Sequence, residues 1–170
     1  MTVRFRITVA AIAIVAVVAL AMPASAGTKQ CEGTGTLVGL PAQSTLNLDD
    51  VAQHRVNLNY AVWSMTSTCA EFDQARQLTR AYHDLVAGSG TGIGYFTIVT
   101  KEGDRAFGKY SSTYKMEMKQ AGSWEQLFTI DWAIYDGTGK CEGMTAKGTA
   151  SGKSTPEGSA YDWQGEFVLP

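Results

Sequence analysis

Apolar and polar residues alternate with a period of two in three stretches of the chain, at 114–119, 124–134 and 161–169. In the second stretch Gln126 is the only polar residue on the apolar side, which otherwise carries large rings and isoleucines. Successive side chains of a β-strand point to opposite faces of its sheet. The pattern therefore predicts three strands, each with one buried face.

Weaker alternation predicts five further strands, and residues that favour turns separate the eight segments. The further strands are expected at 32–39, 54–65, 94–100, 105–110 and 144–152. Glycine, aspartate or proline occurs in the stretches between them, for example at 101–104, 136–139 and 155–158. Eight short strands at regular spacing predict an all-β domain, either an antiparallel barrel or a sandwich.

Residues 69–87 interrupt this pattern. They include Glu71, Gln74 and Ala75, which favour helices, and contain no proline. Their apolar residues fall roughly on one helical stripe. We expect a short helical or irregular insertion that covers one end of the barrel, and a strand within 78–86 is the alternative.

The first 26 residues have the pattern of a cleavable secretory signal. Arg4 and Arg6 precede an apolar run, and an Ala-Ser-Ala triplet ends at Ala26. An uncleaved signal anchor is the alternative, although the run is shorter than the roughly 20 residues of a membrane-spanning helix. We expect a mature domain at 27–170, located in the periplasm or secreted, without an integral membrane segment.

The charge of the chain gives no indication of a nucleic-acid partner. The net charge is −2, and removing the signal with its two arginines makes it −4. Proteins that bind nucleic acids need a clustered basic surface, whereas the charges here are interspersed singly.

Three cysteines remain after cleavage, and an oxidising compartment favours pairing two of them. The similar segments Gln-Cys-Glu-Gly around Cys31 and Lys-Cys-Glu-Gly around Cys141 favour a Cys31–Cys141 disulfide, which would leave Cys69 free. Spacing alone leaves all three pairings open. No metal site or cofactor is expected, because the sequence has no Cys-x-x-Cys pair and His54 and His83 lie far apart.

Three glycine-rich pieces lie at 33–35, 90–94 and 137–140. A phosphate-binding loop places its glycines between a strand and the N-terminus of a helix. Each piece here is followed by a β pattern, so hairpin turns or bulges are the expected structures.

The sequence contains no recognisable catalytic motif. Its serines lack the Gly-x-Ser-x-Gly setting of a nucleophile, and neither histidine has an evident partner, so His54 and His83 are expected at the surface or as caps. Asp131 and Glu142 are the carboxylates that would act as a general acid or base if they faced a barrel lumen. A solvated surface position is the alternative for both.

Aromatic residues are concentrated in the expected strands. A barrel of eight strands is just wide enough to be filled by side chains or to hold one small ligand. Inward rings would form either a packed core or the wall of a ligand pocket. The candidate ligand-binding residues are Tyr114, Trp124, Phe128, Trp132, Tyr161 and Trp163.

The segments 103–110, 124–135 and 137–148 together resemble the barrel of the allene oxide cyclase-like and dirigent-like superfamily. The similarity covers about residues 90–152 and rests on a Gly-Asp strand, a Gly-Thr-Gly-Lys turn and a glycine-rich strand. It implies an eight-stranded antiparallel barrel with an apolar interior, often in multimers. Plant members of that group cyclise a fatty-acid epoxide or direct the coupling of phenolic radicals.

Three functions follow as hypotheses. The first is an exported barrel that binds a small apolar or aromatic molecule without catalysis. The second is an isomerase or cyclase that uses lumen carboxylates such as Asp131. The third is an envelope interaction protein that forms homo-oligomers through one face of the barrel.

Overall fold

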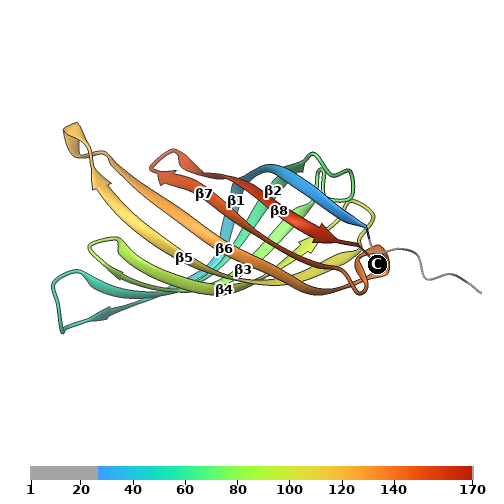
Figure 1. The fold of residues 1–170 in the computed structure, drawn as a ribbon. Coiled ribbons are helices and arrows are strands. Elements are labelled where there is room, and N and C mark those ends of the chain that lie inside the picture. Colours follow the sequence, from blue (N-terminus) through green and yellow to red (C-terminus); the bar gives the residue numbers. More distant parts are fainter. Residues whose placement is uncertain (1–26, 170) are drawn as a thin grey trace, which may run out of the picture.

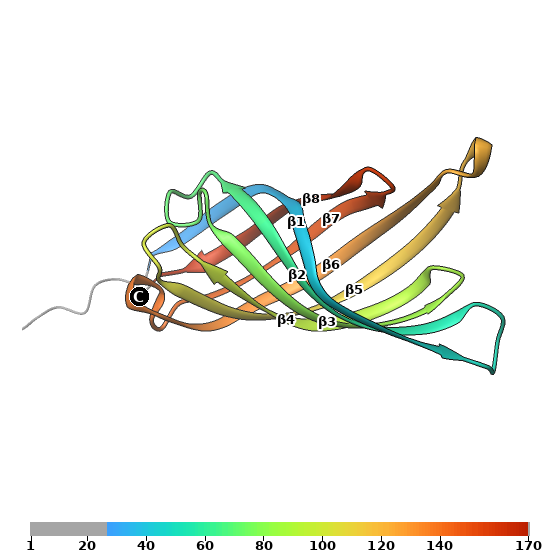
Figure 2. The ribbon, with the colours of Figure 1, turned by 180° about the vertical axis from the view of Figure 1, so that it is seen from behind.

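The computed structural model describes residues 27–169, which form one closed antiparallel barrel of eight strands (Figures 1 and 2). The predicted all-β barrel is therefore confirmed, whereas the predicted secretory signal at 1–26 lies outside the described residues. No helix in the described part of the chain is long and apolar enough to cross a membrane. The strands are β1 (Thr28–Leu48), β2 (His54–Ser67), β3 (Arg76–Val86), β4 (Ser89–Val99), β5 (Arg105–Met118), β6 (Trp124–Thr138), β7 (Thr145–Thr155) and β8 (Gly158–Val168).

Each strand pairs with its neighbours in sequence, and β1 pairs with β8 to close the cylinder. The closing ladder runs from Thr28 opposite Val168 to Thr36 opposite Ala160. Two single-turn 3-10 helices, η1 (Gln120–Gly122) and η2 (Gly139–Cys141), lie in the connections that flank β6. Beyond Thr36, β1 pairs with β2 alone, so the ladder that closes the barrel covers only the first part of β1.

The two ends of the barrel differ. The four hairpin turns, which follow β1, β3, β5 and β7, lie at one end, where the β1–β2 and β5–β6 hairpins extend furthest (Figures 1 and 2). The links after β2, β4 and β6 lie at the other end with the C-terminus. We call the first the open end and the second the packed end.

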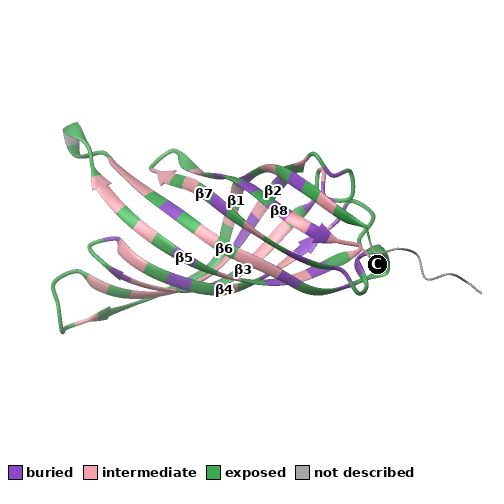
Figure 3. Ribbon diagram, viewed as in Figure 1, coloured by how far each residue is buried: buried purple, intermediate pink, exposed green. Residues whose placement is uncertain are grey.

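The packed end holds the most deeply buried side chains. Phe72, Met144 and Phe167 are each 1% exposed and belong to one apolar cluster with Cys31 and Cys69. Along the strands, buried and exposed positions alternate as the period-two pattern predicts (Figure 3). The apolar cluster closes this end of the lumen.

Inward-facing glycines provide the space for the inward-facing rings. The ring of Tyr161 lies where Gly35 would carry a side chain, and that of Trp132 lies in the same relation to Gly148 and Gly165. A Cβ atom at any of these glycines would collide with the ring. The rings can therefore lie across the neighbouring strand, which a larger residue there would prevent.

This arrangement corrects the expectation for two of the glycine-rich pieces. Residues 33–35 lie within β1 and residues 90–94 within β4, so neither forms a hairpin turn. Gly33, Gly35, Gly92 and Gly94 each lie against a side chain of the barrel interior. In the third piece the turn prediction is correct, because Gly139 begins η2 between β6 and β7.

The predicted helix in 69–87 is wrong, and the alternative of a strand is correct. Residues 76–86 form β3, which is hydrogen-bonded to β2 on one side and to β4 on the other. Two complete ladders outweigh the modest helix propensity of these residues, which amounts to less than about 1 kcal/mol each. Residues 69–75 form the irregular turn that was expected, and Phe72 and Ala75 cover the packed end.

Two predicted strands, 105–110 and 114–119, are one continuous strand, β5. Ser111, Ser112 and Thr113 between them hide the alternation, because Ser112 is a polar residue on the buried side. The count of eight strands is correct because β3 replaces the strand that this merger removes.

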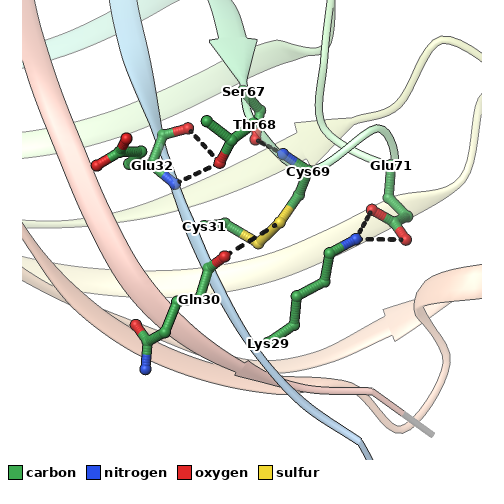
Figure 4. Close-up of a disulfide and its surroundings, with 8 residues drawn as sticks. All are labelled: Lys29, Gln30, Cys31, Glu32, Ser67, Thr68, Cys69 and Glu71. Atoms are coloured by element: carbon green, nitrogen blue, oxygen red, sulfur yellow. Dashed lines mark hydrogen bonds and ion pairs between the residues drawn. A yellow bond between two sulfur atoms is a disulfide. The ribbon is translucent and has the colours of Figure 1, made fainter.

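The predicted Cys31–Cys141 disulfide is also wrong, because Cys31 pairs with Cys69 (Figure 4). Cys69 follows β2 directly, and β2 lies beside β1, so the two Cα atoms are 5.5 Å apart. Around the bond, Thr68 and Glu32 exchange backbone and side-chain hydrogen bonds, and Lys29 forms an ion pair with Glu71 at 3.1 Å. Cys141 is buried with a free thiol in the η2 link.

Candidate functional site

A cavity of about 770 Å³ occupies the interior of the barrel and is lined by residues from all eight strands. Pockets for small molecules have volumes of roughly 300 to 1,000 Å³. The barrel interior is therefore large enough for one such molecule.

All six of the candidate ligand-binding residues line this cavity: Tyr114, Trp124, Phe128, Trp132, Tyr161 and Trp163. They share it because each stands at an inward position of β5, β6 or β8. The period-two alternation therefore predicted correctly that these rings face the inside of the barrel.

A cluster of rings forms the floor of the cavity near the packed end. Trp132 lies 6.3 Å from Trp163 and 5.7 Å from Phe167, measured between ring centroids. Phe72 lies 5.0 Å from Phe167 on the far side. Edge and tilted contacts of this kind stabilise aromatic clusters beyond the effect of burial alone. The floor is therefore a firm apolar surface.

β2 and β3 contribute polar side chains to the cavity wall. Asn57, Asn59, Gln77 and Thr79 line the cavity from these two strands. The hydroxyl of Tyr161 donates a hydrogen bond of 2.8 Å to Oε1 of Gln77, whose Nε2 donates to Thr79 Oγ1 at 3.1 Å. The cavity therefore has hydrogen-bonding groups on β2 and β3 in addition to the aromatic rings of β5, β6 and β8.

His83 and Tyr114 meet inside the lumen. Nε2 of His83 and the hydroxyl of Tyr114 are 3.0 Å apart and share a hydrogen bond. Burial lowers the pKa of His83 to about 4 and raises the pKa of Tyr114. Both side chains are therefore neutral at pH 7, and the expectation that His83 lies at the surface or forms a cap is wrong.

The open end of the cavity has flexible apolar side chains and one cation. Met116, Met118 and Trp124 line it from β5 and β6, and Met118 is 71% exposed. The cation is Arg55 of β2, which also lines the cavity and is exposed. Methionine side chains adapt to ligands of different shape. A molecule that entered the cavity from this end would meet these side chains first.

Asp131 lies on the outside of the barrel. It is an exposed residue of β6, between Ile130 and Trp132, which line the cavity. Glu142 is exposed in the link between β6 and β7. Among the described residues that line the cavity there is no carboxylate. Neither Asp131 nor Glu142 therefore faces the lumen, as the hypothesis of acid–base catalysis by lumen carboxylates requires.

His54 belongs to the outer surface, as expected. Its Nδ1 and Nε2 atoms each lie 2.7 Å from a carboxylate oxygen, of Asp50 and Asp84 respectively. These hydrogen bonds, first that of Asp84 and then that of Asp50, raise the pKa of His54. Because the carboxylates bind opposite nitrogens of one ring, they cannot converge on a metal ion. Across residues 27–169 no group of three or more metal-binding side chains has a suitable arrangement.

No protein-family model matches the chain, and a search of curated proteins finds no match. The resemblance to the allene oxide cyclase-like and dirigent-like superfamily therefore stays a prediction.

The polar residues that β3 contributes to the cavity were not predicted from the sequence. Gln77, Thr79 and His83 alternate with Leu78 and Tyr82 in β3, so the period of two is present. In β3, however, Gln77, Thr79 and His83 share the inward face with Leu85, while Leu78 and Tyr82 lie on the outer face. A search for buried apolar faces cannot detect such a strand, although the bare alternation of residue types could have indicated it.

Proposed function

We propose that this protein is an exported barrel that binds one small apolar or aromatic molecule in its lumen without catalysis. The observation that carries the proposal is the cavity of about 770 Å³, whose wall includes all six of the candidate aromatic residues. A mostly apolar cavity with a few convergent polar groups is the usual form of a small-molecule site.

The chemistry of the wall supports binding rather than turnover. General acid–base catalysis needs a group with a pKa near the working pH. The pKa of His83 is about 4, and burial raises the pKa values of Tyr110, Tyr114 and Tyr161 above their usual range. None of these groups exchanges protons readily at neutral pH.

Two features support export to the periplasm or the medium. Residues 1–26 have the pattern of a secretory signal. The Cys31–Cys69 disulfide suits an oxidising compartment, since cytosolic thiols are kept reduced. Membership of the dirigent-like group is part of the same proposal, and it rests on the glycine-rich segments of the sequence alone.

Titration with N-phenyl-1-naphthylamine, a neutral lipophilic dye that fluoresces in apolar surroundings, tests the proposal. We expect one dye per barrel, with energy transfer from the tryptophans. The variant Ile130→Trp puts extra bulk into the lumen from β6, whereas Leu127→Trp puts it outside on the same strand. The dye should lose affinity for the first variant only. Equal binding to both variants, or no binding to the wild type, contradicts the proposal.

A second candidate function, self-association, rests on the outer face of β2–β4. Leu58, Tyr82 and Ile93 are neighbours in register across the three strands and are 55%, 39% and 60% exposed. Contiguous exposed apolar residues of this kind mark interaction sites. Light scattering should then give a dimer or larger species that Ile93→Lys converts to a monomer. A monomeric wild type excludes this candidate.

A further inference from the structure

A polar cluster of the lumen joins β3 to β5. His83 of β3 and Tyr114 of β5 reach toward each other across Gly92 of β4. A Cβ atom at Gly92 would collide with His83 and with the hydroxyl of Ser112, and would press on the ring of Tyr114. The absence of a side chain at this glycine thus allows three hydrogen-bonding groups to converge.

The cluster has more polar hydrogens than its internal hydrogen bonds use. Neutral histidine and tyrosine have one polar hydrogen each, and the bond between them uses one. One N–H or O–H therefore remains, whichever partner donates. Ser112 adds a third hydrogen, and a further bond within the cluster would use one more. In each of these arrangements one polar hydrogen of the cluster stays unused.

The surroundings of the cluster select against charged ligands. The described wall of the cavity has no carboxylate, and its one permanent cation, Arg55, is exposed. Transferring an ion into such a cavity without a counter-charge is costly. A neutral oxygen that accepts a hydrogen bond avoids this cost.

Building on the proposed function, we propose that the ligand is a neutral ring compound with a ketone or alcohol oxygen, which accepts a hydrogen bond from the His83–Tyr114 pair. The body of the ligand then lies against the aromatic rings. Phe128 is the nearest platform, since its ring centroid is 6.0 Å from that of Tyr114. The oxygen sets the orientation of the ligand, and the rings provide most of the contact.

Three pyrene derivatives test this proposal, because pyrene accepts energy from tryptophan. They are pyrene, which has no oxygen, 1-acetylpyrene, which has a ketone, and pyrene-1-carboxylate, which has a charge. We expect 1-acetylpyrene to bind about five to ten times more tightly than pyrene, the effect of one net hydrogen bond. We expect the carboxylate to bind most weakly.

The double variant His83→Leu/Tyr114→Phe removes every polar atom of the pair. Each single variant keeps one donor and should keep part of the preference for the ketone. The double variant should bind pyrene and 1-acetylpyrene equally, because the remaining hydroxyl of the cluster, that of Ser112, is not among the residues that line the cavity. Tyr95→Phe is the matched control, because Tyr95 lies on the outer face of β4 and is 64% exposed. It should leave all three affinities unchanged.

The outcomes separate the two proposals. If none of the three compounds binds, the proposed function itself fails. If pyrene and 1-acetylpyrene bind the wild type equally, or if the carboxylate binds best, the ligand class proposed here is wrong while the binding function stands. If the double variant still prefers the ketone, the oxygen lies elsewhere, and the role of His83 and Tyr114 is refuted.

Discussion

The two histidines of the barrel have opposite environments, although they lie on neighbouring strands. His83 faces the lumen, where burial lowers its pKa to about 4. His54 faces outward between two carboxylates, which raise its pKa. The position of each residue on the inner or outer side of the wall decides the direction of its shift.

The low pKa of His83 predicts a loss of stability in acid. Unfolding restores an ordinary pKa of about 6.5, so between pH 6.5 and about 4 the unfolded chain binds a proton that the folded barrel does not. The free energy of unfolding should fall across this window by at most about 3 kcal/mol. Urea unfolding of the wild type and of His83→Gln, at several pH values, measures the difference.

Neither His54 nor the carboxylates affect this comparison. The contribution of His54 is fully present below pH 6.5 and is lost at higher pH, as the pH passes its raised pKa. Acidic groups with lowered pKa values, such as Glu117 and Glu125, are the same in both proteins. An equal pH dependence for the wild type and His83→Gln would show that His83 is not buried as described.

Individual strands follow one rule, that an aromatic ring of one strand packs where a glycine of another strand has no side chain. Trp132 on β6 requires Gly148 on β7 and Gly165 on β8, and Phe96 on β4 requires Gly108 on β5. These glycines give the rings space that a side chain would otherwise fill. Glycine at an inward strand position is therefore as important for the cavity as the aromatic residues.

Gly165→Ala should destabilise the barrel by about 1 to 3 kcal/mol, since the new methyl group collides with the ring of Trp132 and with the backbone of β7. Gly39→Ala is the matched control, because nothing lies within 4 Å of the position that its Cβ would take. It should be neutral or slightly stabilising. Thermal unfolding monitored by circular dichroism compares them, and equal effects would contradict the rule.

The disulfide ties the β2–β3 link to β1 at the packed end. Cys31 and Cys69 are separated by 38 residues, and a cross-link over such a loop stabilises a fold by about 4 kcal/mol. Reduction or Cys69→Ala should lower the midpoint of urea unfolding accordingly, and Cys141→Ala should change it much less. Peptide mapping that finds Cys141 in the disulfide would refute this pairing.

The sequence predicted strands well where apolar residues face inward and poorly where they do not. It therefore located β6 and β8, and all six of its candidate aromatic residues line the cavity. It gave a strand within 78–86 only as the alternative to a helix, because the inward residues of β3 include Gln77, Thr79 and His83. It missed the disulfide, because the proximity of Cys31 and Cys69 depends on the pairing of β1 with β2, which no local pattern specifies.

As a whole, the molecule is a cup with one packed and one open end. Phe72 and Phe167 close the packed end, and the hairpins surround the open end (Figure 1). The outer face of β2–β4 has a second hollow, lined by Leu58, Tyr82 and Ile93 among others. An apolar ligand could therefore bind in the lumen or in this outer hollow, and the proposed function requires that it binds in the lumen.

A crystal structure of the protein grown with 1-bromopyrene tests that requirement most directly, because the anomalous scattering of bromine locates the ligand without a prior model. The proposed function predicts one bromine site inside the barrel, with the pyrene rings against Phe128 or Trp132 of β6. A bromine site confined to the outer face of β2–β4, with rings filling the lumen, would contradict it.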